Sequence, residues 1–530
     1  MATLWHGGTI YTMAKENETV NSVLVEQGKI IKTGKKEELE KLFADKIEHV
    51  IDLGNKVMYP GFVDSHLHVI GHGEKLLRLN LSEVSTAERM KELLKEKIAD
   101  LQPGDWIIGE GWNENNFPDR KIFHLDELDE IAPENPMMLT RVCRHAILAN
   151  SFALELAGIT EETSDPSGGV ILRDYNGKAT GYLLDTAQDI VKQAIPEVSE
   201  SYIKHALQTS VDDLLKMGLV GGHTEDLNYY GGFKRTYDAF TDVLNGSKKF
   251  RAHLLVHHEV VDDMVAESLG YGSGTETVEL GAMKIFADGA LGGRTALLSK
   301  PYNDSPETSG VAIHSLDELK GLVKKARKNG MPVAIHTIGD LAMEYALDAI
   351  EAYPITEDKR DRVIHGQILR EDLIERLSKL PVVVDIQPRF VPSDFPWVVE
   401  RLGTWRMDYS YAWKTMIQNN VHCAGGSDAP IEPADPLLGI HAAITRKSPG
   451  ETHEGYYPEE KLTAYEAIEL FTKGSAFAIC KEHERGIIKE GFDADFTVLD
   501  QDLFKIEPDE ILDTNVEMTI VDGTIQYKRN

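Results

Sequence analysis

A long alternation of short apolar segments with helical patterns constrains the fold of this chain more than any other feature of its sequence. The apolar segments have the character of strands that are buried on both faces of a parallel sheet. In order, they span residues 61–66, 219–224, 251–257, 282–287, 332–337, 362–365, 382–387 and 422–427. Eight β–α units predict an α/β fold, the (β/α)8 or TIM barrel, whose functional side chains gather at the carboxyl ends of the strands.

The two ends of the chain carry a different pattern. Short strand-like runs and glycine turns fill residues 1–59, and similar runs return in residues 481–530. Neither set is large enough to bury a core alone, so we expect the two ends to form one small composite β-sandwich domain. The barrel domain then occupies residues 60–480.

The first connection of the predicted barrel is unusually long. About 150 residues separate the first two strand candidates, far more than an ordinary loop contains. This span has strand and helix patterns of its own, so we expect residues 73–200 to form an inserted subdomain. Insertions of this kind often act as lids over an active site, and we expect a lid-like role here.

Composition excludes two classes of partner. The chain has 56 Lys and Arg against 87 Asp and Glu, a net charge of −31, which argues against nucleic acid. It has no apolar run of about 18 residues and no signal-peptide pattern, so we expect no membrane insertion. Three widely spaced cysteines, Cys143, Cys423 and Cys480, indicate no disulfide framework and fit the cytoplasm. We expect a small-molecule substrate, and a homo-oligomer is one of the oligomeric states left open.

The first strand candidate leads into His66-Leu67-His68. Side chains two residues apart on a strand point to the same face, so these two imidazoles can converge on one point. Imidazole is a common ligand of zinc and related ions. Two histidines at a strand end are nevertheless more often a polar terminus than a metal site, so the motif gains weight only from the other strands.

Other strand candidates also carry residues that bind metals or transfer protons. The fourth contains Lys284, the fifth includes His336, the sixth ends in His365 and the eighth is followed by Asp428. Each of these residues alone is explained by burial at a strand end. Four histidines, a lysine and an aspartate at the same end of one barrel together predict an active site.

Several stretches carry a family resemblance. The broader ones are residues 60–68 (PGFVDSHLH) and 485–500, and the narrower ones are 109–114 (GEGWNE), 145–153 (HAILANSFA), 284–296 (KIFADGALGGRTA) and 336–340 (HTIGD). Through these stretches the chain resembles the amidohydrolase superfamily and, within it, the YtcJ-like branch, almost from end to end. The resemblance implies a metal-dependent hydrolase that acts on carbon–nitrogen bonds other than peptide bonds, in an amide, an N-acyl group or a cyclic amide.

The resemblance also implies a metal centre. His66, His68 and Asp428 would bind the more buried divalent ion, and His336 and His365 would bind a second. Histidine and carboxylate ligands suit several metals, and zinc is the expected one.

Lys284 matches a position at which many members of the superfamily carry a lysine carboxylated by CO2. A protonated ammonium has no lone pair to offer a metal, whereas the carbamate supplies two anionic oxygens that bridge the ions. The alternative for Lys284 is an ordinary buried ion pair with Asp288.

The reaction implied by the resemblance is attack of a metal-bound hydroxide on a carbonyl-type carbon, because the ion lowers the pKa of its water. Asp428 would act as general base and then as general acid toward the leaving nitrogen; its alternative role is a helix N-cap. Trp112 and His145 in the insertion, and Asp288 and Arg294 after the lysine strand, are candidates for substrate binding. Packing inside the insertion and structural ion pairs explain these four about equally well.

Two other functions stay open at this point. A mononuclear aminohydrolase, which deaminates a heterocycle, would use the same histidines and aspartate without carboxylation of Lys284. A non-catalytic ligand-binding barrel would lack one or more of the ligands, and none is missing.

Overall fold

The computed structural model describes residues 2–530 except 100, 143, 144, 167, 197 and 357, so Cys143 lies outside the described residues. The chain forms two compact units. One comprises Met1–His72 and Ile203–Asn530 and contains the barrel and both ends of the chain. The other, Gly73–Tyr202, is inserted between the first two barrel strands.

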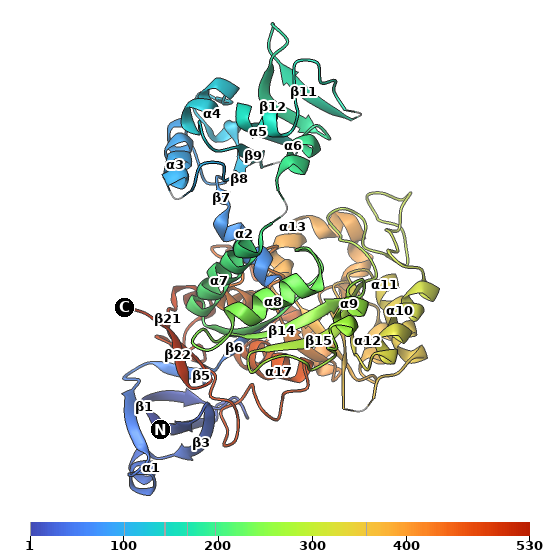
Figure 1. Cartoon of the computed structure of the whole chain (residues 1–530). Coiled ribbons are helices and arrows are strands. Elements are labelled where there is room, and N and C mark those ends of the chain that lie inside the picture. Colours follow the sequence, from blue (N-terminus) through green and yellow to red (C-terminus); the bar gives the residue numbers. More distant parts are fainter. Residues whose placement is uncertain (1, 100, 143–144, 167, 197, 357) are drawn as a thin grey trace. The chain divides into compact units, whose positions relative to one another are not determined.

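A sheet of eight parallel strands forms the barrel (Figure 1). In hydrogen-bonded order the strands are β6 (Phe62–Leu67), β13 (Leu219–Thr224), β14 (Arg251–His257), β15 (Val278–Phe286), β16 (Val333–Thr337), β17 (Asp361–His365), β18 (Val382–Ile386) and β19 (His422–Gly425). All eight predicted strands are confirmed, and the sheet fits a TIM barrel.

The first and last barrel strands meet at their carboxyl ends. The Ser65 hydroxyl donates to the carbonyl of Gly425 at 2.7 Å, and the N–H of Asp428 donates to the carbonyl of His66 at 2.7 Å. Gly426 permits this approach, because a Cβ atom there would lie 2.6 Å from the backbone nitrogen of His66. The barrel therefore brings the ends of two strands that are far apart in sequence against each other.

Helices alternate with the barrel strands (Figure 1). They are α2 (Val69–Leu77), α7 (Glu200–Lys216), α8 (Phe233–Val243), α9 (Val261–Ala266), α10 (Leu316–Lys328), α11 (Asp340–Ala352), α12 (Glu371–Leu377), α13 (Phe390–Leu402), η2 (Thr404–Tyr409), α14 (Trp413–Gln418), α15 (Pro436–Thr445), η3 (Pro458–Glu460), α16 (Ala464–Glu469), the π-helical η4 (Leu470–Gly474) and α17 (Ser475–Ala478). In α10, a capping box of Ser315 and Glu318 fixes the start. Its buried residues, Leu319, Val323 and Ala326, follow the helical period and cover one face.

The two ends of the chain pair into one sheet. Its order is β22 (Thr524–Lys528), β21 (Val516–Val521), β20 (Phe496–Leu499), β5 (Val57–Pro60), β1 (Ala2–Tyr11), β2 (Thr19–Glu26) and β3 (Lys29–Gly34), with β4 (Ile47–Asp52) also paired to β1, and α1 (Lys36–Leu42) and η5 (Pro508–Asp513) beside it. The antiparallel pair β5–β20 joins the two ends, and Trp5, Ile10, Phe496 and Ile520 share one buried cluster. The division of this sheet into the two layers of a sandwich stays a prediction.

The inserted unit has a sheet of its own. Its strands, in hydrogen-bonded order, are β11 (Gly169–Arg173), β12 (Ala179–Asp185), β10 (Ala146–Ala149), β9 (Met137–Arg141), β8 (Ile107–Trp112) and β7 (Leu79–Asn80), accompanied by α3 (Ala87–Ala99), η1 (Glu114–Asn116), α4 (Leu125–Ile131), α5 (Ser151–Leu156) and α6 (Gln188–Ala194). Alternate residues of β9 belong to different hydrophobic clusters, Leu139 to one and Met138 to the other, so both faces of the sheet are packed. Its role as a lid stays a prediction.

None of the described helices combines the length and the apolar character that crossing a membrane needs.

Candidate metal centre

His66 and His68 lie at the carboxyl end of β6, on the same face of the extended chain. Their ring centroids are 5.7 Å apart. His66 is buried, and the side chain of His68 is 23% exposed. His68 Nδ1 donates to the backbone carbonyl of Glu225 at 2.7 Å, which leaves Nε2 to face the centre of the barrel mouth. The predicted motif therefore presents two imidazoles at one point.

Asp428 follows β19 and faces both histidines. Its Oδ1 is 3.5 Å from Nε2 of His66 and 3.5 Å from Nε2 of His68. One candidate ligand atom from each of the three residues lies within 4.8 Å of the other two. The backbone of Asp428 has φ of +58°, which is uncommon outside glycine, and the bond from its N–H to His66 holds it there. Two imidazoles and a carboxylate are a donor set that zinc and related ions accept.

The electrostatics of these residues fit a cation. Burial opposes a charge on His68, but Asp428 outweighs it and raises the pKa of His68 to about 9. Burial would raise the pKa of Asp428, but the hydrogen bond from His68 and the charges of His365 and Lys284 hold it below its ordinary value. Burial lowers the pKa of His66 well below its ordinary value. A divalent ion requires an ionised carboxylate and neutral imidazoles as ligands, and its binding displaces a proton from an imidazole that is protonated.

His336 and His365 form a second pair of imidazoles on the neighbouring strands β16 and β17. Nδ1 of His336 and Nε2 of His365 are 3.0 Å apart. The outer nitrogens face acceptors, because His336 Nε2 donates to the carbonyl of Gly289 at 3.2 Å and His365 Nδ1 donates to Gln387 Oε1 at 2.8 Å. A neutral ring has one proton, so the two facing nitrogens both present lone pairs. A cation relieves the repulsion between them, and this pair also fits a metal.

Lys284 lies on β15 with its side chain fully buried. Its Nζ is 3.3 Å from Nε2 of His66 and 4.7 Å from the centroid of the Phe286 ring. Burial lowers the pKa of Lys284, which favours the neutral amine. The six predicted ligand residues thus lie at the carboxyl ends of five strands of one barrel.

Asp288 and Arg294 follow Lys284 in the chain. Asp288 Oδ1 lies 3.6 Å from Nε2 of the candidate ligand His336. The carboxylate of Asp288 accepts three backbone N–H groups, those of Leu297, Ile338 and Gly339, at 2.8, 3.0 and 2.8 Å. It thereby joins the loop after β15 to the turn between β16 and α11. Arg294 is partly exposed and pairs with Asp304 at 2.8 Å. Substrate contact by either residue stays a prediction.

Trp112 and His145 belong to the inserted unit. Trp112 is 1% exposed, lies in one of that unit's hydrophobic clusters and donates its indole N–H to the carbonyl of Leu139 at 2.9 Å. The side chain of His145 is mostly exposed, and its Nδ1 lies 3.0 Å from Asp185. Contact of these two residues with substrate also stays a prediction.

Three further residues complete the surroundings of the centre. Glu225 is fully buried after β13 and accepts the Tyr229 hydroxyl at 2.7 Å. Gln387 orients His365, as described above. Asp64 is buried on β6 and accepts the N–H groups of His66 and Ser427 at 3.0 and 3.1 Å. In the sequence, the acidic pair Glu225-Asp226 at the end of the second strand candidate could have indicated that Glu225 belongs to the site. No pattern distinguishes Gln387 and Asp64 from ordinary strand residues.

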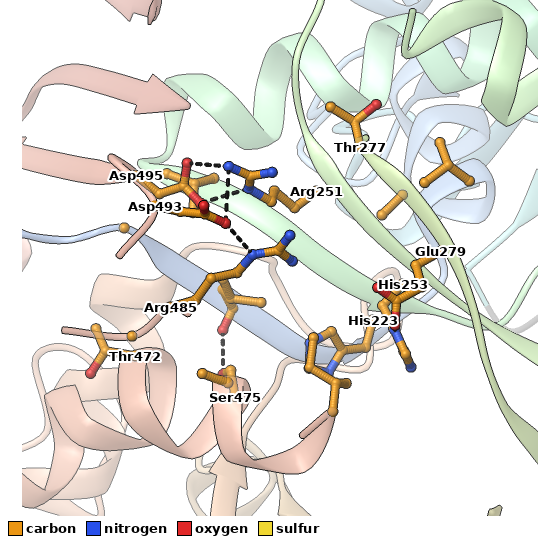
Figure 2. A pocket seen from close by; sticks show the side chains of 18 of the residues that line it. His223, Arg251, His253, Thr277, Glu279, Thr472, Ser475, Arg485, Asp493 and Asp495 are labelled. Carbon is orange, nitrogen blue, oxygen red and sulfur yellow. Dashed lines mark hydrogen bonds and ion pairs between the residues drawn. The ribbon is translucent and has the colours of Figure 1, made fainter. Parts of the chain in front are cut away.

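A cavity of about 50 Å³ lies at the opposite, amino-terminal end of the barrel (Figure 2). Figure 2 shows the ion pairs that gather above it, where Arg251 binds Asp495 at 2.7 Å and Arg485 binds Asp493 at 2.8 Å. Arg251, on barrel strand β14, also lies 3.4 Å from Asp493, so its pairs with Asp493 and Asp495 join the barrel to the carboxyl-terminal segment. His223, on β13, lines this cavity.

Comparisons with known proteins agree with this geometry. The model of the amidohydrolase family matches residues 49–527. Bacillus subtilis YtcJ, which is named as an amidohydrolase, is 50% identical over 532 residues, the full length of both chains. The N-substituted formamide deformylase of Arthrobacter pascens is 28% identical over 98% of this chain and 97% of its own. The crystal structure of a metal-dependent hydrolase from Pyrococcus furiosus superposes with a TM-score of 0.80 at 28% identity, covering 95% of this chain and all of the other.

Proposed function

The chain belongs to the amidohydrolase family, and from this premise we propose that it hydrolyses the carbon–nitrogen bond of an amide, an N-acyl group or a cyclic amide, with Asp428 as general base and acid. The chain is an amidohydrolase-type hydrolase, an enzyme that acts on carbon–nitrogen bonds. The proposal concerns the substrate class and the residues that carry the reaction.

The position of Asp428 is the observation that carries the proposal. Its carboxylate is buried, has a pKa held below the ordinary value and lies 3.5 Å from a ring nitrogen of both His66 and His68. A carboxylate so placed can take a proton from the attacking water at its Oδ atoms and return it to the leaving nitrogen. The proton is thereby conserved over the reaction, and the amine leaves in a neutral form.

A divalent ion, for which zinc is our proposal, would be held by His66, His68 and Asp428, with His336 and His365 as the ligands of a second position. When bound, it would supply Lewis acidity, which polarises the scissile carbonyl and acidifies water. The facing lone pairs of His336 and His365 and the carboxylate of Asp428 support this assignment.

Carboxylation of Lys284 is part of the same proposal. The neutral amine nitrogen would form a bond to the carbon of CO2 and lose one proton, which gives a carbamate with two anionic oxygens. Burial favours the neutral amine that this step needs, and Nζ lies 3.3 Å from His66. Asp288, which would otherwise pair with the ammonium, is bonded to backbone N–H groups instead.

The substrate class can be tested with a panel of simple compounds. The panel contains N-substituted formamides, acetamides and ureas, five- and six-membered cyclic amides, and amino-substituted heterocycles. Formamides are included because a relative of similar length is named as a formamide deformylase. The purified enzyme is loaded with zinc, and newly formed amine or ammonia is measured, because opening of a cyclic amide leaves its amine within the product.

The proposal predicts release of amine from at least one amide class. Ammonia from an amino-heterocycle alone would point to a deaminase instead, and no release from any compound by metal-loaded enzyme would contradict the proposal.

A further inference from the structure

Seven aromatic rings form a closed circuit around the amine of Lys284. The centroid distances along the circuit are 5.7 Å from His66 to His68, 6.2 Å to Tyr229, 6.4 Å to His257, 6.0 Å to Phe286, 5.2 Å to His336, 4.5 Å to His365 and 5.8 Å back to His66. Nζ of Lys284 is 4.7 Å from one of these rings, Phe286, and 3.3 Å from another, His66. Each of the seven rings therefore lies beside two others of the circuit.

The circuit has two different halves. The four candidate ligands His66, His68, His336 and His365 come from strands β6, β16 and β17. The remaining three rings, Tyr229, His257 and Phe286, are consecutive in the circuit and come from the loop after β13 and from the ends of β14 and β15. We call these three residues the aromatic arc. The four histidines thus form one run of the circuit and the aromatic arc the other, with Lys284 on the same strand as Phe286.

Tyr229 is the most accessible ring of the aromatic arc. It lies in the loop after β13 and is 49% exposed. Its hydroxyl donates to Glu225 Oε2 at 2.7 Å, and Glu225 is fully buried. This bond fixes the ring while it leaves much of the ring surface uncovered. A fixed, exposed aromatic surface binds a flat partner with little further loss of conformational freedom.

Phe286 extends the same surface toward the reactive groups. Its ring is partly exposed and is flanked by His257 on one side and His336 on the other. Asp428 lies 3.5 Å from Nε2 of His68, and the His68 ring is 6.2 Å from Tyr229, so the arc begins one ring away from the proposed proton-transfer group. Contacts between two aromatic rings add specificity beyond the area that they bury, roughly 3- to 10-fold in affinity.

We propose that the aromatic arc selects amide substrates that carry a planar aromatic substituent, such as a benzyl group, over those with an aliphatic substituent of equal size. This inference rests on the proposed function, because it names the substrate class of the same site. Tyr229 acts through its ring in this proposal, and its hydroxyl only holds that ring in place. Specificity is therefore expected to survive loss of the hydroxyl but not loss of the ring.

A binding experiment tests the inference separately from hydrolysis. The probes are N-benzylmethanesulfonamide and N-(cyclohexylmethyl)methanesulfonamide, two amide analogues that differ only in the aromatic character of the ring and resist hydrolysis. Their affinities for the full-length, zinc-loaded protein are measured by titration calorimetry. The same ratio of affinities is then measured for Tyr229→Phe, Tyr229→Leu and, as a matched control on β22 in the terminal sheet, Tyr527→Leu. Far-ultraviolet circular dichroism and thermal melting verify that each variant is folded.

The inference predicts that the native protein binds the benzyl compound about 10-fold more tightly than the cyclohexylmethyl compound. Tyr229→Phe and Tyr527→Leu keep that ratio, and Tyr229→Leu reduces it to about 2-fold or less. Equal affinities in the native protein, no binding of either probe at millimolar concentration, or a loss in Tyr229→Phe as large as in Tyr229→Leu would each overturn the inference. Failure of the proposed function gives a different result, namely selective binding of the benzyl probe by an enzyme that hydrolyses no amide.

Discussion

The side-chain amide of Gln387 accepts a hydrogen bond of 2.8 Å from Nδ1 of His365. The amide is itself oriented, because its Nε2 donates to the backbone carbonyl of Asp385 at 3.0 Å. The proton of the His365 ring is therefore held on Nδ1, and the lone pair of Nε2 points toward His336. An outer hydrogen bond of this kind is how proteins fix the tautomer of a metal-binding histidine.

Replacing Gln387 by leucine is expected to weaken metal binding 10- to 100-fold, the usual effect of losing an outer partner of a ligand. Competition with a chromophoric chelator measures the affinity. Gln208→Leu on the surface of α7, where the amide contacts Asp212, is the matched control and is expected to bind metal as the native protein does. Native affinity in Gln387→Leu would contradict the role of His365 as a ligand.

Asp428→Asn is expected to keep most of the metal and to lose turnover by roughly 10²- to 10⁴-fold, because the amide retains an oxygen donor but cannot accept the proton. Elemental analysis and kcat are measured on the same preparation. Asp435→Asn serves as the control from the same loop, since Asp435 caps α15 and asparagine caps equally well. Unchanged kcat in Asp428→Asn would remove this residue from proton transfer.

Carboxylation of Lys284 is testable by ¹³C NMR of metal-loaded protein equilibrated with ¹³C-bicarbonate. A carbamate resonance is expected in the native protein and is expected to be absent from Lys284→Met. Native protein without this resonance, holding one metal ion for each chain, would instead favour the mononuclear alternative.

Asp394 on α13 is expected to make the free energy of unfolding depend on pH, because its carboxyl group is buried. Burial raises the pKa of Asp394 to about 6, and nearby Glu432 adds to the effect, while hydrogen bonds from Tyr411 and Gln367 oppose it. Because the folded-state pKa lies above the unfolded value, the stabilisation is complete at low pH and is lost as pH rises toward and through 6. The native protein should therefore lose about 1 kcal/mol relative to Asp394→Asn between pH 5.5 and 7.5.

Thermal melting of both proteins across this range measures the effect as a change in the difference between their Tm values. A constant difference in Tm across this pH range would show that the pKa of Asp394 in the folded protein lies outside it.

The sequence alone was sufficient to predict the barrel and the positions of the candidate ligands, because both depend on local patterns. His66 and His68 follow a buried strand at a spacing that places them on one face, and Lys284, His336 and His365 lie at the ends of similar strands. The contact of Asp428 with His66 was predictable only through the barrel, which closes residues far apart in sequence.

Other parts of the site depend on contacts that no local pattern contains. Glu225 supports His68 through its backbone carbonyl, which any residue could supply. The carboxylate of Asp288 lies 3.6 Å from His336 and also accepts backbone N–H groups from two loops, whose conformations no local pattern contains. Tyr229 owes its place beside His68 to the packing of the loop after β13.

Dependence of hydrolysis on the metal tests the central claim most directly. Amine release from a reactive amide of the panel is measured on purified protein, after chelation, and after zinc is restored to the chelated sample. Chelation is expected to abolish release, and added zinc is expected to restore it in proportion to the metal bound. Full activity in protein shown by elemental analysis to contain no metal would rule out a metal-dependent reaction.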